Sequence, residues 1–137
     1  MQISPIDPNQ VDFFWPAIAQ HIEASQRCSM ADMTAEEVRG WCRTDESWRL
    51  LIFENFQAAA VLRVWDDRLH VVAIGGRFEK GWHHEFFAWL VRLARFFGLR
   101  FVTLGGRKGW TRLLRPLGFV PIGGPFLGVE VPRELEP

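Results

Sequence analysis

Three short runs of β-branched, aliphatic and aromatic residues follow one another without a helical pattern between them, and one long amphipathic segment comes next. The runs span 48–54, 58–65 and 69–74, and the long segment spans 82–97. Short connections favour antiparallel pairing of the runs, whereas apolar residues at helical spacing predict a helix over 82–97 that Gly98 ends. The pattern therefore predicts an α/β (α+β) domain whose central sheet is mixed but mostly antiparallel.

Six further segments complete the chain. Apolar residues at helical spacing predict helices over 11–25 and 34–45, and Thr34 and Glu37 have the spacing of a capping box at the start of the second. The remaining elements are expected to be a strand, a short helix and two final strands, over 101–104, 109–117, 119–122 and 126–131. No linker or repeat divides the chain, so we expect one domain over 1–137 in the order ααβββαβαββ.

The composition argues against several classes of function. The 137 residues include 16 Lys or Arg and 16 Asp or Glu, so the net charge offers no general attraction to nucleic acid or to an acidic membrane. No stretch is both long and apolar enough to cross a bilayer. Cys28 and Cys42 lack the spacing of a disulfide framework, and no carboxylate or cysteine completes a metal site around His83 and His84. We expect a cytoplasmic protein with reduced thiols and no bound metal.

Two groups of side chains leave alternatives open. Basic residues surround the short helix expected over 109–117, namely Arg107, Lys108, Arg112 and Arg115. They form a solvated face, a phosphate site or, together with Trp110, a nucleic-acid contact, and the neutral net charge argues against the last. Aromatic residues also exceed what one face of each helix can bury. Rings such as Phe13, Phe87 and Trp89 therefore line a substrate pocket or form a surface for a homodimer.

Recognisable motifs flank the helix expected over 82–97. Residues 80–82 are Lys-Gly-Trp, and residues 94–98 are Ala-Arg-Phe-Phe-Gly. Together with the element order, they resemble the GNAT superfamily of N-acetyltransferases, in which a phosphate-binding turn leads into a helix that ends in Ala-Arg-x-x-Gly. The stretch 113–119 is similar to the Leu-Gly-Phe ending after the family's last helix, and 106–110 is similar to a segment of small GNAT-like proteins from phage genomes.

The turn before this helix is where the resemblance implies that the pyrophosphate of acetyl-CoA binds. Unpaired N–H groups and the partial positive charge of a helix N-terminus favour a phosphate there. The family's pattern is Gln or Arg, two free positions, Gly, one free position, then Gly or Ala; its fixed positions fall on Phe78, Gly81 and His83, and only Gly81 fits. The resemblance assigns coenzyme binding to the amides of 81–84 and to six residues of this turn: Arg77, Phe78, Lys80, Gly81, Trp82 and His83.

Two further coenzyme contacts follow from the same resemblance. Positive charge beside the pyrophosphate is expected from Arg77, Lys80 or a protonated His83, since the signature Gln or Arg is missing. The strand expected over 69–74 is implied to bind the pantetheine arm through its backbone, in a slot where it diverges from the strand 101–104. These backbone contacts are assigned to Val72, Ala73 and Ile74.

The resemblance implies transfer of an acetyl group from acetyl-CoA to a primary amine of unknown identity. The tyrosine that protonates the departing thiolate in many family members is replaced by Leu114, and the chain has no tyrosine. The thioester is already activated, so positioning the amine still supplies much of the rate. Glu54 and His70 are candidate catalytic bases. The alternative is a GNAT-like interaction or assembly protein without catalysis, which the degenerate turn, the missing tyrosine and the surplus of aromatic residues favour.

Overall fold

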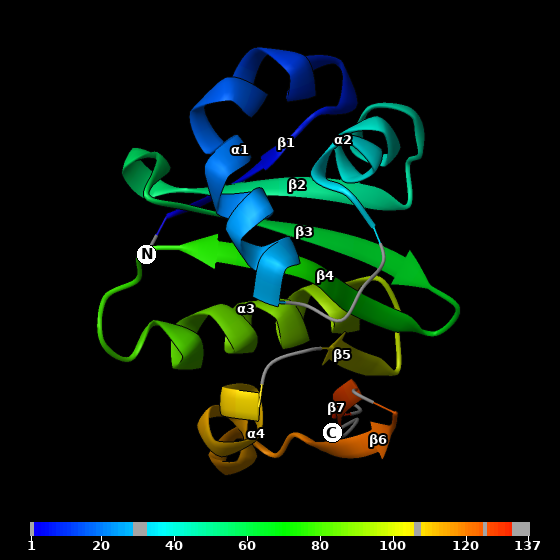
Figure 1. The fold of residues 1–137 in the computed structure, drawn as a ribbon. Helices are drawn as coiled ribbons and strands as arrows, with labels where there is room; N and C mark the ends of the chain where they lie inside the picture. Colours follow the sequence, from blue (N-terminus) through cyan, green and yellow to red (C-terminus); the bar gives the residue numbers. More distant parts are fainter. Residues whose placement is uncertain (1, 29–32, 106–107, 125, 133–137) are drawn as a thin grey trace.

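The computed structural model describes residues 2–28, 33–105, 108–124 and 126–132. Within these ranges one seven-stranded sheet has the order β1-β2-β3-β4-β5-β7-β6, with helices on both faces (Figure 1). The strands are β1 Ile3–Ile6, β2 Trp48–Phe53, β3 Ala58–Trp65, β4 Arg68–Gly76, β5 Phe101–Gly105, β6 Val120–Gly123 and β7 Phe126–Glu130. The helices are α1 Val11–Cys28, α2 Ala35–Thr44, α3 Trp82–Phe96 and α4 Lys108–Leu114, with 3-10 helices at Pro8–Gln10, Glu54–Phe56 and Arg115–Leu117. Only β4 and β5 pair in parallel, which confirms the predicted mixed, mostly antiparallel sheet.

The strand β1 lies at the edge of the sheet and is missing from the predicted order. It pairs antiparallel with β2, so that Ile3 lies opposite Phe53 and Ile6 opposite Leu50. Pro5 hides this strand in the sequence, because proline lacks an N–H group and argues against a central strand. An edge strand tolerates it, since one side of the strand needs no partner. The other elements occur in the predicted order.

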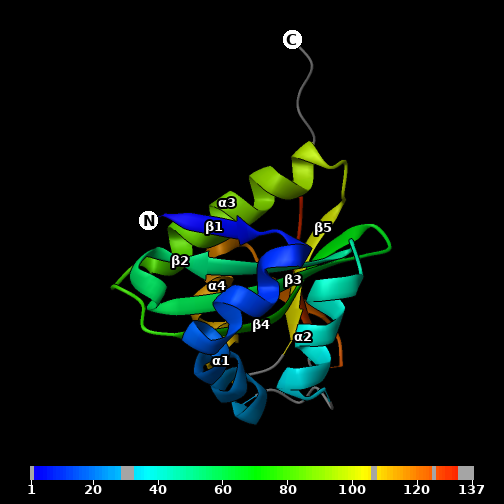
Figure 2. The same ribbon diagram turned by 90° about the horizontal axis from the view of Figure 1, so that it is seen from above.

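The sheet separates two apolar layers, with α3 on one side and α1 and α2 on the other (Figure 2). The helices α1 and α2 contribute to the first layer Val11, Ile18, Ile22, Val38 and Cys42. The helices α3 and α4 contribute to the second layer Phe86, Phe87, Leu90, Ala94 and Leu114. Alternation along β2 serves both layers, since Leu50 faces the first and Leu51 faces the second.

The predicted capping box is confirmed at the start of α2. The Thr34 hydroxyl accepts a hydrogen bond of 3.1 Å from the backbone N–H of Glu37. In return, the Glu37 carboxylate accepts one of 3.1 Å from the backbone N–H of Thr34. These reciprocal bonds satisfy two N–H groups that would otherwise lack a partner at the helix N-terminus.

Some expectations fall outside the described part of the chain. Gly106 and Arg107 lie outside it, as do the side chains of Cys28 and Lys108. Cys42 is a buried free cysteine, and burial raises the pKa of its thiol to about 12. In the described ranges, no helix is long and apolar enough to cross a membrane, and no three His, Cys, Asp or Glu side chains are grouped to hold a metal ion.

One expectation about the aromatic residues is wrong. Phe87 is not left over at the surface, because its ring is buried in the layer between the sheet and α4, 5.2 Å from the ring of Phe119. The contact with α4 widens the buried face of α3 beyond a single helical stripe. Trp89 is half-buried against the same layer, whereas Phe13 and Phe96 are 81% and 82% exposed.

The helix α1 approaches the end of β4 very closely. A Cβ atom at Gly75 would overlap the backbone carbonyl oxygen of His21 in α1, so this approach requires glycine. Gly75 and Gly76 both belong to β4, so the predicted end of the strand at Ile74 is wrong. A Gly-Gly pair often signals a turn, but here it makes room for the helix backbone and lets β4 continue.

We expect Gly75→Ala to lower the free energy of unfolding by about 1–3 kcal/mol, because the added methyl group must push α1 away from β4. Gly40→Ala in α2 is the matched control, since a Cβ atom there meets nothing within 4 Å. It should raise the free energy by about 0.5–1 kcal/mol through helix propensity. Urea unfolding of both variants tests this, and equal effects would contradict the proposed contact.

Candidate functional site

The strands β4 and β5 pair over only part of their length. The last aligned pair is Val71 with Leu104, whereas β4 continues to Gly76. The strand β5 itself ends at Gly105, so β4 beyond Val71 has no strand partner on this side. A pocket of about 500 Å³ lies at this opening, between α1, β4, α3 and α4. The residues that line it include Ala24, Ile74, Trp82, Trp110 and Leu113. The opening is therefore a slot with mostly apolar side walls.

A bulge in β4 sets the strand's direction at the slot. Val61 of β3 pairs with Ala73 and the next residue, Leu62, pairs with Val71, so Val72 is an extra residue on β4. Val72 and Ala73 both pack against the layer of α1 and α2. Of the three strand residues expected to contact the coenzyme, only Ile74 lines the pocket. Gly75 and Gly76, which lie beyond the strand predicted over 69–74, line it as well.

The backbone of β4 offers polar groups to the slot. The N–H of Arg77 donates to Gln57 on the β3 side at 2.8 Å. Because successive residues of a strand alternate, the N–H and C=O groups of Gly76 and Ile74 point the other way, toward the slot. The N–H of Ile74 donates to the hydroxyl of Ser25 at 3.1 Å, so a buried residue of α1 already satisfies one of these groups. A serine in the last turns of a helix is common, so the sequence carries no signal for this contact.

The turn before α3 offers fewer free N–H groups than expected. Gly81 caps the helix with φ of 84°, a left-handed conformation that favours glycine. The N–H of Trp82 donates to Glu79 at 3.1 Å, and that of His84 donates to Gly81 at 3.2 Å. The expectation that all four amides of 81–84 are available is therefore wrong. Among the described residues, the N–H groups of Gly81 and His83 are left without a backbone partner.

The side chains of the turn divide into an apolar and a polar set. Phe78 stacks on Trp82 with ring centroids 3.9 Å apart, so its side chain belongs to the pocket wall. Arg77 and Lys80 are exposed and remain the turn's cations.

His83 departs from two expectations. Its ring lies 4.2 Å from that of His84, although adjacent helical residues are expected to diverge. At the first turn of a helix no preceding turn restricts the side chains, so both rings can swing to the same side. Burial and then the charge of His84 lower the pKa of His83, which disfavours the protonated form expected beside a phosphate.

The two candidate bases lie in different places. Glu54 is exposed after β2 and borders a shallow hollow of about 120 Å³, which Glu79, Lys80 and Gly81 of the turn also line. His70 lies on β4, one residue before the last aligned pair with β5. The structure therefore places Glu54 beside the turn and His70 where the slot opens.

His70 is held in a neutral form. Its Nδ1 atom lies 2.7 Å from the hydroxyl oxygen of the buried Thr103, and its ring meets those of Trp65 and Phe126 edge-on at 5.7 and 5.6 Å. Burial, followed by the charges of Arg68 and Arg63, lowers the pKa of His70 to about 4. At neutral pH the imidazole is thus uncharged and a weak base.

Comparison with known structures identifies the fold. No protein-family model and no curated protein matches the chain. The ribosomal-protein-S18-alanine N-acetyltransferase of Escherichia coli has a TM-score of 0.68 at 18% identity, covering 98% of this chain and 96% of that one. A Desulfovibrio desulfuricans protein described as a GNAT-family acetyltransferase has a TM-score of 0.62 at 13% identity. The match covers 96% of this chain and 99% of that one. A Salmonella typhimurium protein described as an acetyltransferase and solved with acetyl-CoA has a TM-score of 0.63 at 17% identity. The match covers 100% of this chain and 97% of that one. This chain has the GNAT fold.

The GNAT fold clarifies what α4 contributes to the slot. Leu114, at the position where the resemblance places a tyrosine, is fully buried in the layer below α3. The residues of α4 that line the pocket are Gly109, Trp110 and Leu113, and none of them carries a hydroxyl group. In the described part of this GNAT fold, α4 thus supplies apolar walls to the slot and no acid.

His70 should make the folded protein sensitive to acid. Its folded pKa lies below the ordinary value of 6.5, so the unfolded chain takes up a proton first, and stability falls as the pH drops from 6.5 to about 4. The loss attributable to His70 is up to about 3 kcal/mol. We expect His70→Gln to lose less stability than the wild type between pH 7 and pH 4.5 in urea unfolding. Parallel losses in the two proteins would contradict the assigned pKa.

Proposed function

We propose that this protein transfers an acetyl group from acetyl-CoA to a primary amine. The observation that carries the proposal is the slot beside the end of β4, beyond its last pair with β5, with backbone groups on one wall and the turn before α3 nearby. The structural neighbours support it, since one was solved with acetyl-CoA and another is an N-acetyltransferase that acts on an alanine of ribosomal protein S18.

The slot and the turn suit different parts of the coenzyme. The N–H of Gly76 and the C=O of Ile74 are suited to bind the amide groups of pantetheine, as a neighbouring strand would. The N–H groups of Gly81 and His83 and the positive end of α3 are suited to the pyrophosphate. Arg77 and Lys80 would add positive charge there. Pantetheine binding through backbone atoms does not depend on the missing signature residues.

The reaction needs few side chains once both substrates are in place. The amine nitrogen attacks the thioester carbonyl carbon, the C–N bond forms, the C–S bond breaks, and the ammonium proton passes to water or a base. A thiol of pKa about 8.5 leaves readily as a thiolate, so a missing acid slows the step without blocking it. A general acid adds about 10²–10⁴-fold in other enzymes. Because its pKa is low, His70 is better suited to accept a hydrogen bond from the amine than to hold its proton.

Calorimetric titration with acetyl-CoA tests the proposal. We expect the wild type to bind and Gly81→Glu to weaken binding at least about tenfold, because a carboxylate would repel the pyrophosphate. Gly98→Glu is the matched control. Gly98 has φ of 73°, close to the 84° of Gly81, and a Cβ atom at either position meets nothing within 4 Å. The control therefore introduces the same charge and similar backbone strain at the opposite end of α3.

The control gives the titration a clear interpretation. Loss of affinity in Gly81→Glu alone would support the coenzyme site, whereas equal losses would indicate that the turn is not the phosphate site. A wild-type protein that binds no acyl-CoA would contradict the enzyme and favour the interaction module. The exposed rings of Phe96 and Phe97 are the observation that favours that second candidate.

A further inference from the structure

A row of polar side chains crosses the sheet just before the slot. Arg63 of β3 lies directly opposite His70 of β4, which in turn lies opposite Thr103 of β5. Trp48, the partner of Arg63 on β2, packs in the layer of α1 and α2, so the row faces that side of the sheet. The residue after His70, Val71, forms the last pair with β5, and the slot begins beyond that pair. The row therefore borders the place where an acetyl group and an amine would meet.

Two arginines of this region share one indole ring. The guanidinium carbon of Arg63 lies 5.3 Å from the ring centroid of Trp65, and that of Arg68 lies 5.2 Å from it. Arg63 also lies 5.3 Å from the ring of Trp48. Contacts with aromatic faces hold a guanidinium in place without using its N–H groups. The two side chains are thus positioned by the rings, without a hydrogen bond to any described residue.

Neither arginine is neutralised by the described part of the protein. Arg39 and Arg43 pair with Asp12, and Arg49 pairs with Asp7, but no described carboxylate lies within 4.0 Å of Arg63 or Arg68. Two nearby acids, Asp45 and Asp67, have other partners. Asp45 accepts hydrogen bonds from Ser47, which, with a smaller contribution from the charge of Arg63, lower its pKa. A carboxylate oxygen of Asp67 lies 3.9 Å from a terminal guanidinium nitrogen of Arg100.

The burial of these two arginines makes the missing partner costly. The Nε atom of each is out of contact with water and has no hydrogen-bond partner among the described residues. An unsatisfied buried donor costs about 1–3 kcal/mol, and more when it is charged. An anion bound at the terminal N–H groups would make charge-assisted hydrogen bonds beside these buried Nε atoms. The same charges help to lower the pKa of His70, which places all three groups in one positive field.

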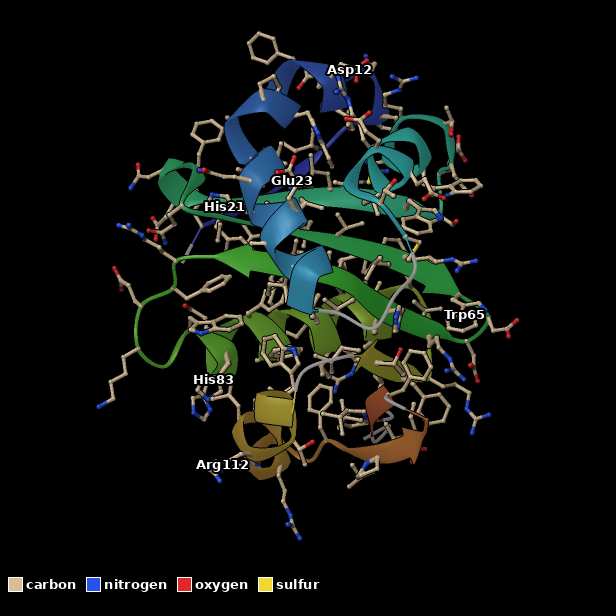
Figure 3. All side chains as sticks on the ribbon, viewed as in Figure 1. Asp12, His21, Glu23, Trp65, His83 and Arg112 are labelled. Atoms are coloured by element: carbon tan, nitrogen blue, oxygen red, sulfur yellow. The ribbon has the colours of Figure 1, made fainter. Side chains whose placement is uncertain are left out.

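The position of the pair separates it from the coenzyme's phosphates. Trp65 lies at the end of the β3–β4 hairpin, and His83 marks the start of α3 at the opposite end of the sheet (Figure 3). A pyrophosphate at the turn would therefore lie far from Arg63 and Arg68. An anion at the two arginines must belong to the other substrate.

We infer that the amine acceptor carries an anionic group, a carboxylate or a phosphate, which binds Arg63 and Arg68 while its amine lies at the slot beside His70. This inference rests on the proposed acetyl transfer. The planar guanidinium, with its fork of N–H donors, matches both anions. Acceptors without a negative charge would leave two positive side chains uncompensated beside a neutral histidine.

Side-chain NMR of the full-length protein tests the inference directly. The Nε–Hε signals of Arg63 and Arg68 are assigned from Arg63→Lys and Arg68→Lys, and the wild type is titrated with two matched pairs of amines. These are phosphoethanolamine with ethanolamine, and β-alanine with β-alaninamide. All four probes carry an ammonium group at neutral pH, and only phosphoethanolamine and β-alanine carry an anionic group as well. We expect only the anion-bearing member of at least one pair to shift both signals, and that pair identifies phosphate or carboxylate. The exposed Arg112 of α4, which lies apart from Trp65 in Figure 3, should not respond and serves as the control.

The inference is wrong if neither phosphoethanolamine nor β-alanine moves the two signals, or if ethanolamine and β-alaninamide move them equally. Arg63→Gln combined with Arg68→Gln should weaken binding of the responding probe at least tenfold. Acetyl-CoA titration of the same wild-type sample separates the two proposals. Coenzyme binding without an anion response overturns the inference alone, whereas an anion response without coenzyme binding supports the anion site and counts against acetyl transfer.

Discussion

The close contact between the backbone of α1 and the end of β4 is the constraint on which the slot depends. Gly75 allows the carbonyl of His21 to approach β4, and the His21 side chain donates from Nε2 to the carbonyl of Phe56 at 2.9 Å. Ser25 then binds the N–H of Ile74. These contacts tie the helix, the strand and the turn after β2 together. The end of β4 that they fix extends past its last pair with β5, so its outer backbone groups face a pocket instead of another strand.

Much of this arrangement follows from local sequence signals. Thr34 with Glu37 marks the start of α2, Gly98 follows α3, and the successive β-type runs give the antiparallel part of the sheet. The resemblance of 80–82 and 94–98 to the GNAT pattern correctly predicts the fold. The signals are local, and the elements they specify are the ones found.

The errors arise where distant segments meet. Pro5 disguises an edge strand, and Gly75 resembles a turn residue because the helix that packs on it is far away in the sequence. Ser25, Arg63 and Arg68 have no sequence signal for a site. Packing of α1 brings Ser25 to the N–H of Ile74, and the sheet register places the two arginines beside His70, before the slot. The backbone hydrogen bonds of Trp82 and His84 are likewise a property of the folded turn.

The strand β4 joins two environments of different chemistry. Before the bulge at Val72 it carries His70 in a positive, aromatic setting, and beyond the bulge it presents backbone groups to a mostly apolar slot. A thioester suits the second environment and a charged acceptor suits the first. Only a few residues of β4 separate the two environments, and a direct transfer requires two bound substrates to lie next to each other.

Amide hydrogen exchange, followed residue by residue by NMR with and without acetyl-CoA, tests the central claim most directly. The account predicts that acetyl-CoA slows exchange at least about tenfold at Gly76, Gly81 and His83, whose N–H groups face the slot or the turn. Arg77, whose N–H already bonds to Gln57, should change little. Unchanged exchange at Gly76, or protection confined to other parts of the sheet, would contradict a coenzyme site between β4 and β5.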